Sequence, residues 1–309
     1  MRCASGDKPA GAPTTAAVST GAPRRRGFAL RALVRGAVLS FALVAAGDGG
    51  ALACPTDFPV NGMAKRTASA PFLNTKGLFG RLEAWSPTGT RLRLHAAYFD
   101  PTDEYGHGVL GDLKDGKGLT IRITANDGSG PGTCPTGVFL PEGLVFEGVT
   151  PLVADVDPGG YPEVVVTESS VTQGARLSIY DRHGERLAST PFIGQRNRWL
   201  SLIGAGDLDG DGRVEIAYID RPHLAQVLRV WRYDKGRLTE VANAEGFTNH
   251  RIGWPFIEGG VRDCGQGPEM ILASGDWSKI MAVRFDGRLQ ARLLAGYAPA
   301  MIGAAMECR

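Results

Sequence analysis

The segment GDLDGDGRVEIAYID (206–220) places four carboxylates within nine residues. They are Asp207, Asp209, Asp211 and Glu215, and an apolar, strand-like run follows the last of them. Like charges at this density repel one another, so the pattern indicates that a positive group lies among them. A hard divalent cation, which binds carboxylate and carbonyl oxygens, is the chemistry that such a cluster suits.

The spacing of these residues differs from that of a helix–loop–helix calcium site. The aspartates occupy positions 1, 3 and 5, Gly212 permits a sharp turn, and the last acid falls at position 9. A helical calcium loop would carry its bidentate glutamate at position 12, where this chain has Tyr218. We therefore expect a nine-residue Ca²⁺ loop between two strands, with the backbone carbonyl of Arg213 as a further ligand. The alternative is an Asp- and Gly-rich turn that holds no ion.

Two further loops resemble this one in part. The segment DVDPGGYPE (155–163) keeps Asp155, Asp157 and Glu163 but has Gly159 at position 5, and we predict a weaker second metal site there. The segment VRDCGQGPE (261–269) has a valine at position 1, and we expect it to bind no ion.

A period of about 50 residues links these loops. The segments 161–166, 213–218 and 267–272 align on a glutamate, and these glutamates are 52 and 54 residues apart. A second landmark, an aspartate before a turn and an Arg-Leu pair, recurs in phase with separations of 53 and 52 residues. Its aspartates are Asp181, Asp234 and Asp286. Two landmarks with one period predict structural repeats.

Each repeat is predicted to contain four short strands. In the central repeat they cover 199–206, 214–220, 227–234 and 237–242, and the third alternates apolar and polar residues. No long segment has helical periodicity. Four antiparallel strands per repeat predict an all-β fold, a β-propeller of four-stranded blades.

The chain end predicts how the ring closes. Residues 301–309 match the opening strand of the central repeat, and a lone strand would expose an edge. We expect residues 302–309 to pair with the N-terminal hairpin at 81–99, so that strand exchange between the termini closes the ring. The length from residue 54 onward, divided by the period, gives about five blades, with clear repeats at 145–309 and divergent blades at 57–144.

The N-terminal segment reads as an export signal. Residues 1–23 have no periodicity and are interpreted as a disordered or misassigned start. Residues 24–53 contain three arginines, an eleven-residue apolar run and an Ala-x-Ala site before Cys54, which predicts a signal peptide, with an uncleaved anchor as the alternative. We expect a periplasmic or extracellular protein, a single domain at 54–309, with no transmembrane segment after cleavage.

Charge and cysteine content agree with export. The chain carries a net charge of +2, but residues 1–53 contribute +5, so the remainder carries −3 and offers no nucleic-acid-binding surface. An even number of cysteines remains, as expected for disulfides in an oxidising compartment. They are Cys54, Cys134, Cys264 and Cys308. Three pairings are possible; Cys308 could reach Cys54 or Cys264, and alignment of the repeats slightly favours Cys264.

The motif DLDGDGRVEI within a repeat of about 50 residues resembles the FG-GAP/VCBS repeat of integrin-type β-propellers, whose calcium loop has the pattern D-x-D-x-D-G-x-x-[DE]. The resemblance implies a secreted or surface protein in which calcium braces the loops between strands. It assigns ligand roles to Asp207, Asp209, Asp211, Glu215 and the carbonyl of Arg213.

Catalytic motifs are absent from the sequence. The five histidines form no metal-binding pair four residues apart, and there is no nucleophile elbow or phosphate-binding glycine loop. Trp254 and Trp277 lie near predicted loops, where they could form a sugar-stacking platform or pack in the core. We expect a non-catalytic binding module for a protein or glycan; the alternative is a small secreted polysaccharide-acting enzyme, a glycosidase or lyase.

Overall fold

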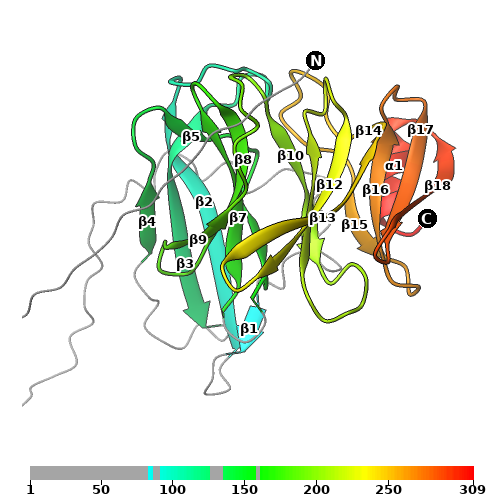
Figure 1. Ribbon diagram of the computed structural model, residues 1–309, viewed down its shortest axis with the longest axis horizontal. Helices are drawn as coiled ribbons and strands as arrows, with labels where there is room; N and C mark the ends of the chain where they lie inside the picture. The colour runs from blue at the N-terminus through cyan, green and yellow to red at the C-terminus, as the bar shows by residue number, and fades with distance from the viewer. Residues whose placement is uncertain (1–82, 86–90, 126–134, 158–160) are drawn as a thin grey trace, which may run out of the picture. The chain divides into compact units, whose positions relative to one another are not determined.

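Antiparallel strands dominate the computed structural model, which describes residues 83–85, 91–125, 135–157 and 161–309 (Figure 1). The described strands form three sheets. The first contains β1 (Glu83–Trp85), β2 (Arg91–Thr102), β3 (Asp115–Ala125), β4 (Thr136–Phe139), β5 (Leu144–Phe146), β6 (Leu152–Ala154), β7 (Glu163–Ser170), β8 (Gly174–Tyr180) and β9 (Arg186–Ser189). The second contains β10 (Leu200–Gly206), β11 (Glu215–Asp220), β12 (Val227–Asp234) and β13 (Arg237–Glu245). The third contains β14 (Phe247–Thr248), β15 (Gly260–Asp263), β16 (Pro268–Ser274), β17 (Lys279–Phe285) and β18 (Leu289–Gly296).

The second sheet confirms the four strands predicted for the central repeat. Its order is β10-β11-β12-β13, with antiparallel pairs between consecutive strands. The landmark residues of the predicted repeats lie at corresponding points. Glu163 and Glu215 open β7 and β11, and Glu269 is the second residue of β16. The N-terminal hairpin is also present, because β1 pairs with β2.

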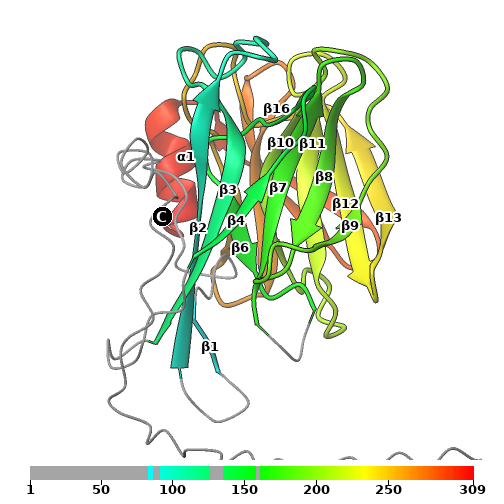
Figure 2. The ribbon, with the colours of Figure 1, turned by 90° about the vertical axis from the view of Figure 1, so that its left-hand side faces the viewer.

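The sheets pack face to face through shared apolar clusters. Along β11, Ile216 and Tyr218 join a cluster with the first sheet, whereas Ala217 and Ile219 join a cluster with the third. Successive side chains of a strand point to opposite faces, so both faces of this sheet are covered. This explains why every residue of β11 is buried and why its residues 216–219, between two terminal carboxylates, are apolar in succession rather than alternating with polar ones. Figure 2 shows the first sheet on its near side.

The predicted C-terminal closing strand is wrong. Residues expected to pair with the N-terminal hairpin form the helix α1 (Pro299–Met306), and no described strand joins the end of the chain to β1 or β2. Proline at the first turn and a run rich in alanine favour a helix here. Ile302, Ala305 and Met306 follow helical spacing and pack on the third sheet. The strand exchange between the termini is therefore not part of this structure.

A disulfide joins Cys264, which follows β15, to Cys308, just after α1. This confirms the favoured pairing, although the reason differs: the helix α1, rather than a strand aligned with the Cys264 loop, returns the chain to the β15 end. Cys54, Cys134 and the predicted signal peptide at 24–53 lie outside the described residues. In the part of the chain that the structure describes, no helix is long and apolar enough to cross a membrane.

Candidate functional site

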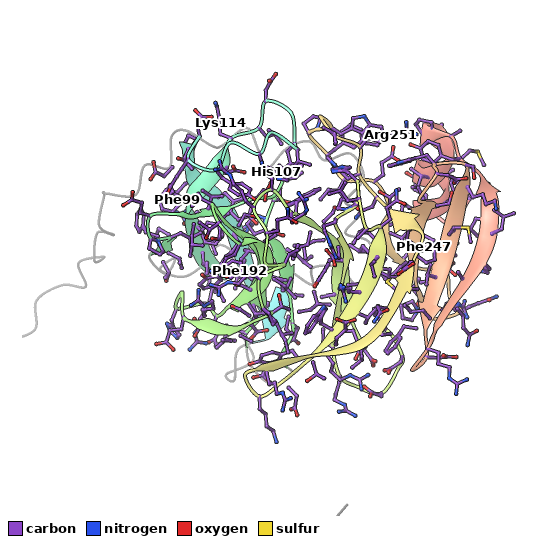
Figure 3. The ribbon with its side chains drawn as sticks, turned by 45° about the horizontal axis from the view of Figure 1, so that its top comes forward. Phe99, His107, Lys114, Phe192, Phe247 and Arg251 are labelled. Carbon is purple, nitrogen blue, oxygen red and sulfur yellow. A yellow bond between two sulfur atoms is a disulfide. The ribbon has the colours of Figure 1, made fainter. Side chains whose placement is uncertain are left out.

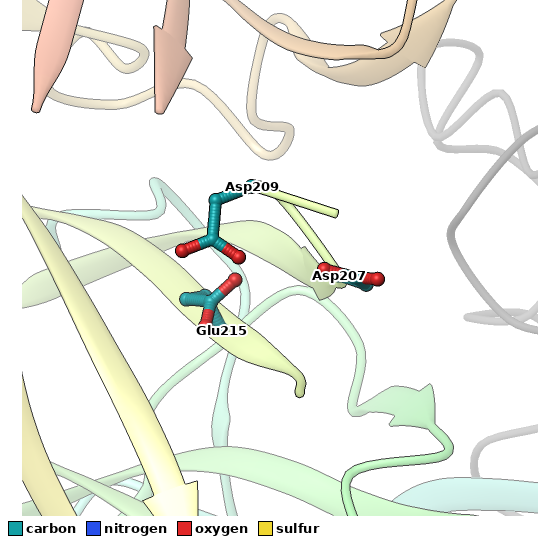
Figure 4. Close-up of side chains that lie close together, drawn as sticks. All are labelled: Asp207, Asp209 and Glu215. Atoms are coloured by element: carbon teal, nitrogen blue, oxygen red, sulfur yellow. The ribbon is translucent and has the colours of Figure 1, made fainter. Parts of the chain in front are cut away.

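The acidic loop connects β10 to β11 and gathers its carboxylates. Ligand oxygens of Asp207, Asp209 and Glu215 lie within 4.8 Å of one another, close enough to hold one metal ion (Figure 4). Glu215 is fully buried at the start of β11, whereas the two aspartates are half-buried. The structure therefore brings together three of the four predicted carboxylate ligands.

Backbone amides hold the loop in its shape. Asp207 accepts hydrogen bonds from the N–H groups of Gly210 at 2.7 Å and Gly212 at 3.0 Å. Both glycines have positive φ, 79° and 85°, a backbone conformation that most other residues avoid. Glu215 accepts from the N–H of Leu208 at 3.0 Å. The Asp-Gly pattern thus sets the turn as well as the charge.

A guanidinium lies among these carboxylates. Arg232 on β12 donates from Nε to Glu215 and from Nη2 to Asp209, both at 2.6 Å. Its Nη2 also lies 3.3 Å from Asp211, which lies at the same distance from Arg213. Burial raises the pKa of Glu215, while Arg232 and the Leu208 amide oppose that shift. The positive group that these carboxylates require is therefore in part the Arg232 side chain.

The three grouped carboxylates still fit a hard cation. Carboxylate oxygens are the donors that calcium and magnesium prefer, and each retains acceptor capacity beyond its present hydrogen bond. A cation there would share Asp209 and Glu215 with Arg232.

The corresponding positions in the other sheets differ in charge. Glu269 receives hydrogen bonds from Arg262 at 2.5 Å and Arg292 at 2.8 Å. Burial disfavours the ionised Glu269, but these bonds outweigh it and lower the pKa of Glu269. Arginines therefore surround the carboxylate at the position where no ion was expected.

Glu163, at the predicted weaker site, has no cationic partner among the described residues. Its Oε2 accepts from the N–H groups of Val156 at 2.8 Å and Asp157 at 3.1 Å. Burial, together with the charges of Asp155 and Asp157, raises the pKa of Glu163 to about 7. Residues 158–160 of this loop lie outside the described residues.

A second feature is a cluster of aromatic rings around Arg251, here called the aromatic cluster. The Arg251 guanidinium carbon lies 4.3 Å from the ring centroid of Trp277, 5.5 Å from that of Trp254 and 5.6 Å from that of Tyr297. These rings come from three separate segments and are half-buried. Trp277 has a φ of 60°, unusual for a large side chain and a sign of backbone strain. Trp254 and Trp277, predicted as a platform or as core, thus lie together at the surface.

A cavity of about 290 Å³ lies near this cluster. Its lining combines apolar and basic residues, and none of the ten described lining residues is acidic. The lining includes His107, Arg198, Arg221, His223, Leu224 and Ile252. Figure 3 shows His107 and Arg251 at the same end of the sheets.

His107 is oriented by a buried carboxylate. Its Nδ1 lies 2.6 Å from Oε1 of Glu147, which is 1% exposed and also accepts a hydrogen bond from Ser169. Burial raises the pKa of Glu147, and the bonds from His107 and Ser169 oppose that shift. With Nδ1 engaged, Nε2 is the polar ring atom left to face the cavity.

His223 is fixed through a chain of hydrogen bonds. His250 Nε2 lies 2.8 Å from the Trp254 carbonyl, which can only accept, so this nitrogen carries the hydrogen. Burial lowers the pKa of both His223 and His250 to about 4, so both rings are neutral near pH 7. His250 Nδ1 therefore accepts from His223 Nε2 at 2.9 Å, and His223 Nδ1 is left as an acceptor.

Sequence reasoning missed this histidine group. His107, His223 and His250 come from three loops far apart in the chain, and only the tertiary fold brings them together. A search for histidines at helical spacing has no means of finding them.

Comparisons with known proteins identify no family. No family model matches the chain, and no curated protein matches it. Among solved structures, it is similar to the crystal structure of the exotype rhamnogalacturonan lyase YesX, with a TM-score of 0.37 and 16% identity. The alignment covers 67% of this chain and 42% of that one, so this chain spans less than half the length of that structure. At this TM-score the likeness carries no argument about function.

Proposed function

We propose that this chain is a secreted, non-catalytic binding module built as a calcium-braced β-propeller of the FG-GAP/VCBS type, with a glycan or protein as its ligand. The observation that carries the proposal is the aromatic cluster. Trp, Tyr and Arg are the side chains that contribute most to binding energy at protein surfaces. Here three segments converge to present them at one end of a rigid set of sheets.

The sheet packing supports the propeller part of the proposal. The central four-stranded sheet packs on a neighbour through each face, as a blade does between two others. The number of blades, about five, rests on the repeat period. The calcium part rests on the carboxylates of Asp207, Asp209 and Glu215.

An enzyme acting on polysaccharides is the weaker alternative. Glycoside hydrolysis uses two carboxylates that flank the scissile bond across a cavity. The His107 cavity has no Asp or Glu among its described lining residues, and Glu147 lies behind His107. The geometry therefore favours binding.

A glycan array probed with the full chain, alongside generic glycosidase and lyase assays, tests the proposal. We expect saturable binding to a subset of glycans and no turnover. Trp277→Ala should weaken binding about tenfold or more, since aromatic anchors at hot spots contribute 2 kcal/mol or more. Phe139→Ala, an exposed aromatic on β4, is the matched control and should leave binding unchanged. Turnover in the assays, or equal binding by both variants, would contradict the proposal.

A further inference from the structure

We propose that the cavity beside His107 binds a sugar acid, a ligand that carries a carboxylate, several hydroxyl groups and an apolar carbon face. The volume of about 290 Å³ suits one sugar residue rather than a long chain, since drug-sized ligands occupy cavities of roughly 300–1,000 Å³. The cavity is separate from the aromatic cluster and does not depend on the glycan proposal.

The positive charge of the cavity lining favours an anionic ligand. Arg198 and Arg221 line the cavity, and no described lining residue is acidic. Arg221 already pairs with Asp220 through two hydrogen bonds, at 2.7 and 2.9 Å. Among the described residues, Arg198 donates only to the backbone carbonyl of Asn197, from Nη1, so its charge is the one left for a ligand. A carboxylate paired with a guanidinium in a planar, two-bond arrangement is the favoured match.

Two ring nitrogens fixed in position favour a ligand with hydroxyl groups. Glu147 holds Nδ1 of His107, which leaves Nε2 to meet the ligand. The hydrogen-bond chain through His250 leaves Nδ1 of His223 as an acceptor. Both rings are held from behind, so a ligand hydroxyl, which can donate or accept, meets nitrogens whose positions are already set. A simple fatty acid has no group that pairs with them.

Apolar side chains at the rim complete the match. Leu224 and Ile252 are 64% and 71% exposed, unusually high for large apolar residues, and both line the cavity. The C–H face of a sugar ring can cover such side chains while its polar groups point inward.

Isothermal titration of the full chain with D-glucuronate tests the inference. We expect saturable binding, with a Kd on the order of 1 mM or tighter. D-glucose lacks the carboxylate and hexanoate lacks the hydroxyls, and each should bind about tenfold more weakly or worse. A glucuronate-terminated oligosaccharide shows whether the ligand is the end of a polysaccharide or the free sugar acid. Tighter binding than the monosaccharide assigns the site to a polysaccharide end, and weaker binding assigns it to the free acid; either result with saturation supports the inference.

Variants locate the binding. Arg198→Gln should weaken glucuronate binding about tenfold or more and Arg198→Lys should weaken it less. His107→Leu should weaken it several-fold. Arg237→Gln, an exposed arginine on β13, is the matched control. The inference is overturned if glucuronate shows no saturable binding, if glucose or hexanoate binds equally well, or if Arg198→Gln binds like the control.

Ligand binding at the aromatic cluster and sugar-acid binding in the His107 cavity can be tested independently. Trp277→Ala should reduce array binding and leave glucuronate binding intact, whereas Arg198→Gln should do the reverse for any array ligand that lacks an acidic sugar. Loss of both activities in one properly folded variant would contradict the separation of the two sites.

Discussion

At the residue scale, Arg232 supplies part of the positive charge that the carboxylates of the acidic loop require. The sequence shows that the carboxylates need a positive neighbour, but it cannot say whether that neighbour is an ion or a side chain 17 residues beyond Glu215. Only the register of β11 against β12, which pairs Glu215 with Arg232, places the guanidinium there. The three-carboxylate group was predictable from spacing; its arginine partner was not.

Replacing Arg232 distinguishes the contribution of its guanidinium from that of a bound metal ion. Arg232→Met removes the charge but keeps the length, and leaves Glu215 buried beside Asp209 without its ion pair. Breaking a buried pair in this way costs about 3–5 kcal/mol. Thermal melts in EDTA should therefore show a much lower Tm, and calcium should restore most of it by binding the folded state.

Arg213→Met, at an exposed position in the same loop, is the control and should change Tm little. Wild-type protein should also gain several degrees from calcium, and Asp209→Ala should abolish that gain. If neither wild type nor Arg232→Met responds to calcium, the metal site does not exist and arginine side chains alone offset the charge of the loop.

The histidine pair makes a pH prediction at the same scale. The pKa values of His223 and His250 are lowered from 6.5 to about 4. Between these values the unfolded state binds protons that the folded state does not, so this pair makes the protein less stable as pH falls from about 6.5 to 4. NMR titration of the ring C–H signals should show two histidines near 4, assigned by His223→Gln and His250→Gln.

Titration of all histidines near 6.5 would contradict the hydrogen-bond chain behind the cavity. The pH dependence of the melting temperature alone is a poor test of the histidine effect, because protonation of Glu163 changes stability in the opposite direction. Its pKa is raised to about 7, so the folded state binds the proton first and gains stability as pH falls through that range.

At the element scale, the strands were predictable and the C-terminal helix was not. Alternation marks β12, a short apolar run marks β11, and turn residues separate the strands; all of these are local signals. The segment MIGAAMECR resembles the opening strand of the central repeat, although Ile302, Ala305 and Met306 have helical spacing. In a segment this short, similarity to a repeat and helical periodicity compete, and the apolar face offered by Ile271 and Ile280 favours the helix.

The disulfide should secure this helix. It closes a loop of 44 residues, and the loop-entropy relation gives about 4 kcal/mol of stabilisation. Cys308→Ser should lower the free energy of unfolding by about 2–4 kcal/mol in guanidinium titrations. Ile302→Ala, which removes a fully buried side chain from α1, should cost about 2–5 kcal/mol. Unchanged stability in both variants would mean that α1 does not pack on the third sheet.

At the scale of the whole molecule, the apolar clusters are shared between sheets rather than confined to one. The cluster that contains Leu228 joins the second and third sheets, and the cluster that contains Leu177 joins the first and second. Loss of one sheet therefore exposes the face of the next. The period in the sequence predicted the central unit, but which faces pack together depends on tertiary contacts that no local pattern encodes.

This sharing predicts cooperative unfolding. Leu228→Ala creates a cavity at a fully buried position of the central sheet and should cost about 2–5 kcal/mol. Because both neighbours depend on that sheet, calorimetry of the full chain should show one main transition that moves as a whole to lower temperature. Leu293→Ala, at a 58% exposed position of β18, should shift it by about 0.5 kcal/mol or less. Two resolved transitions, of which Leu228→Ala moves only one, would show that the sheets unfold independently and that the stacked arrangement does not couple them.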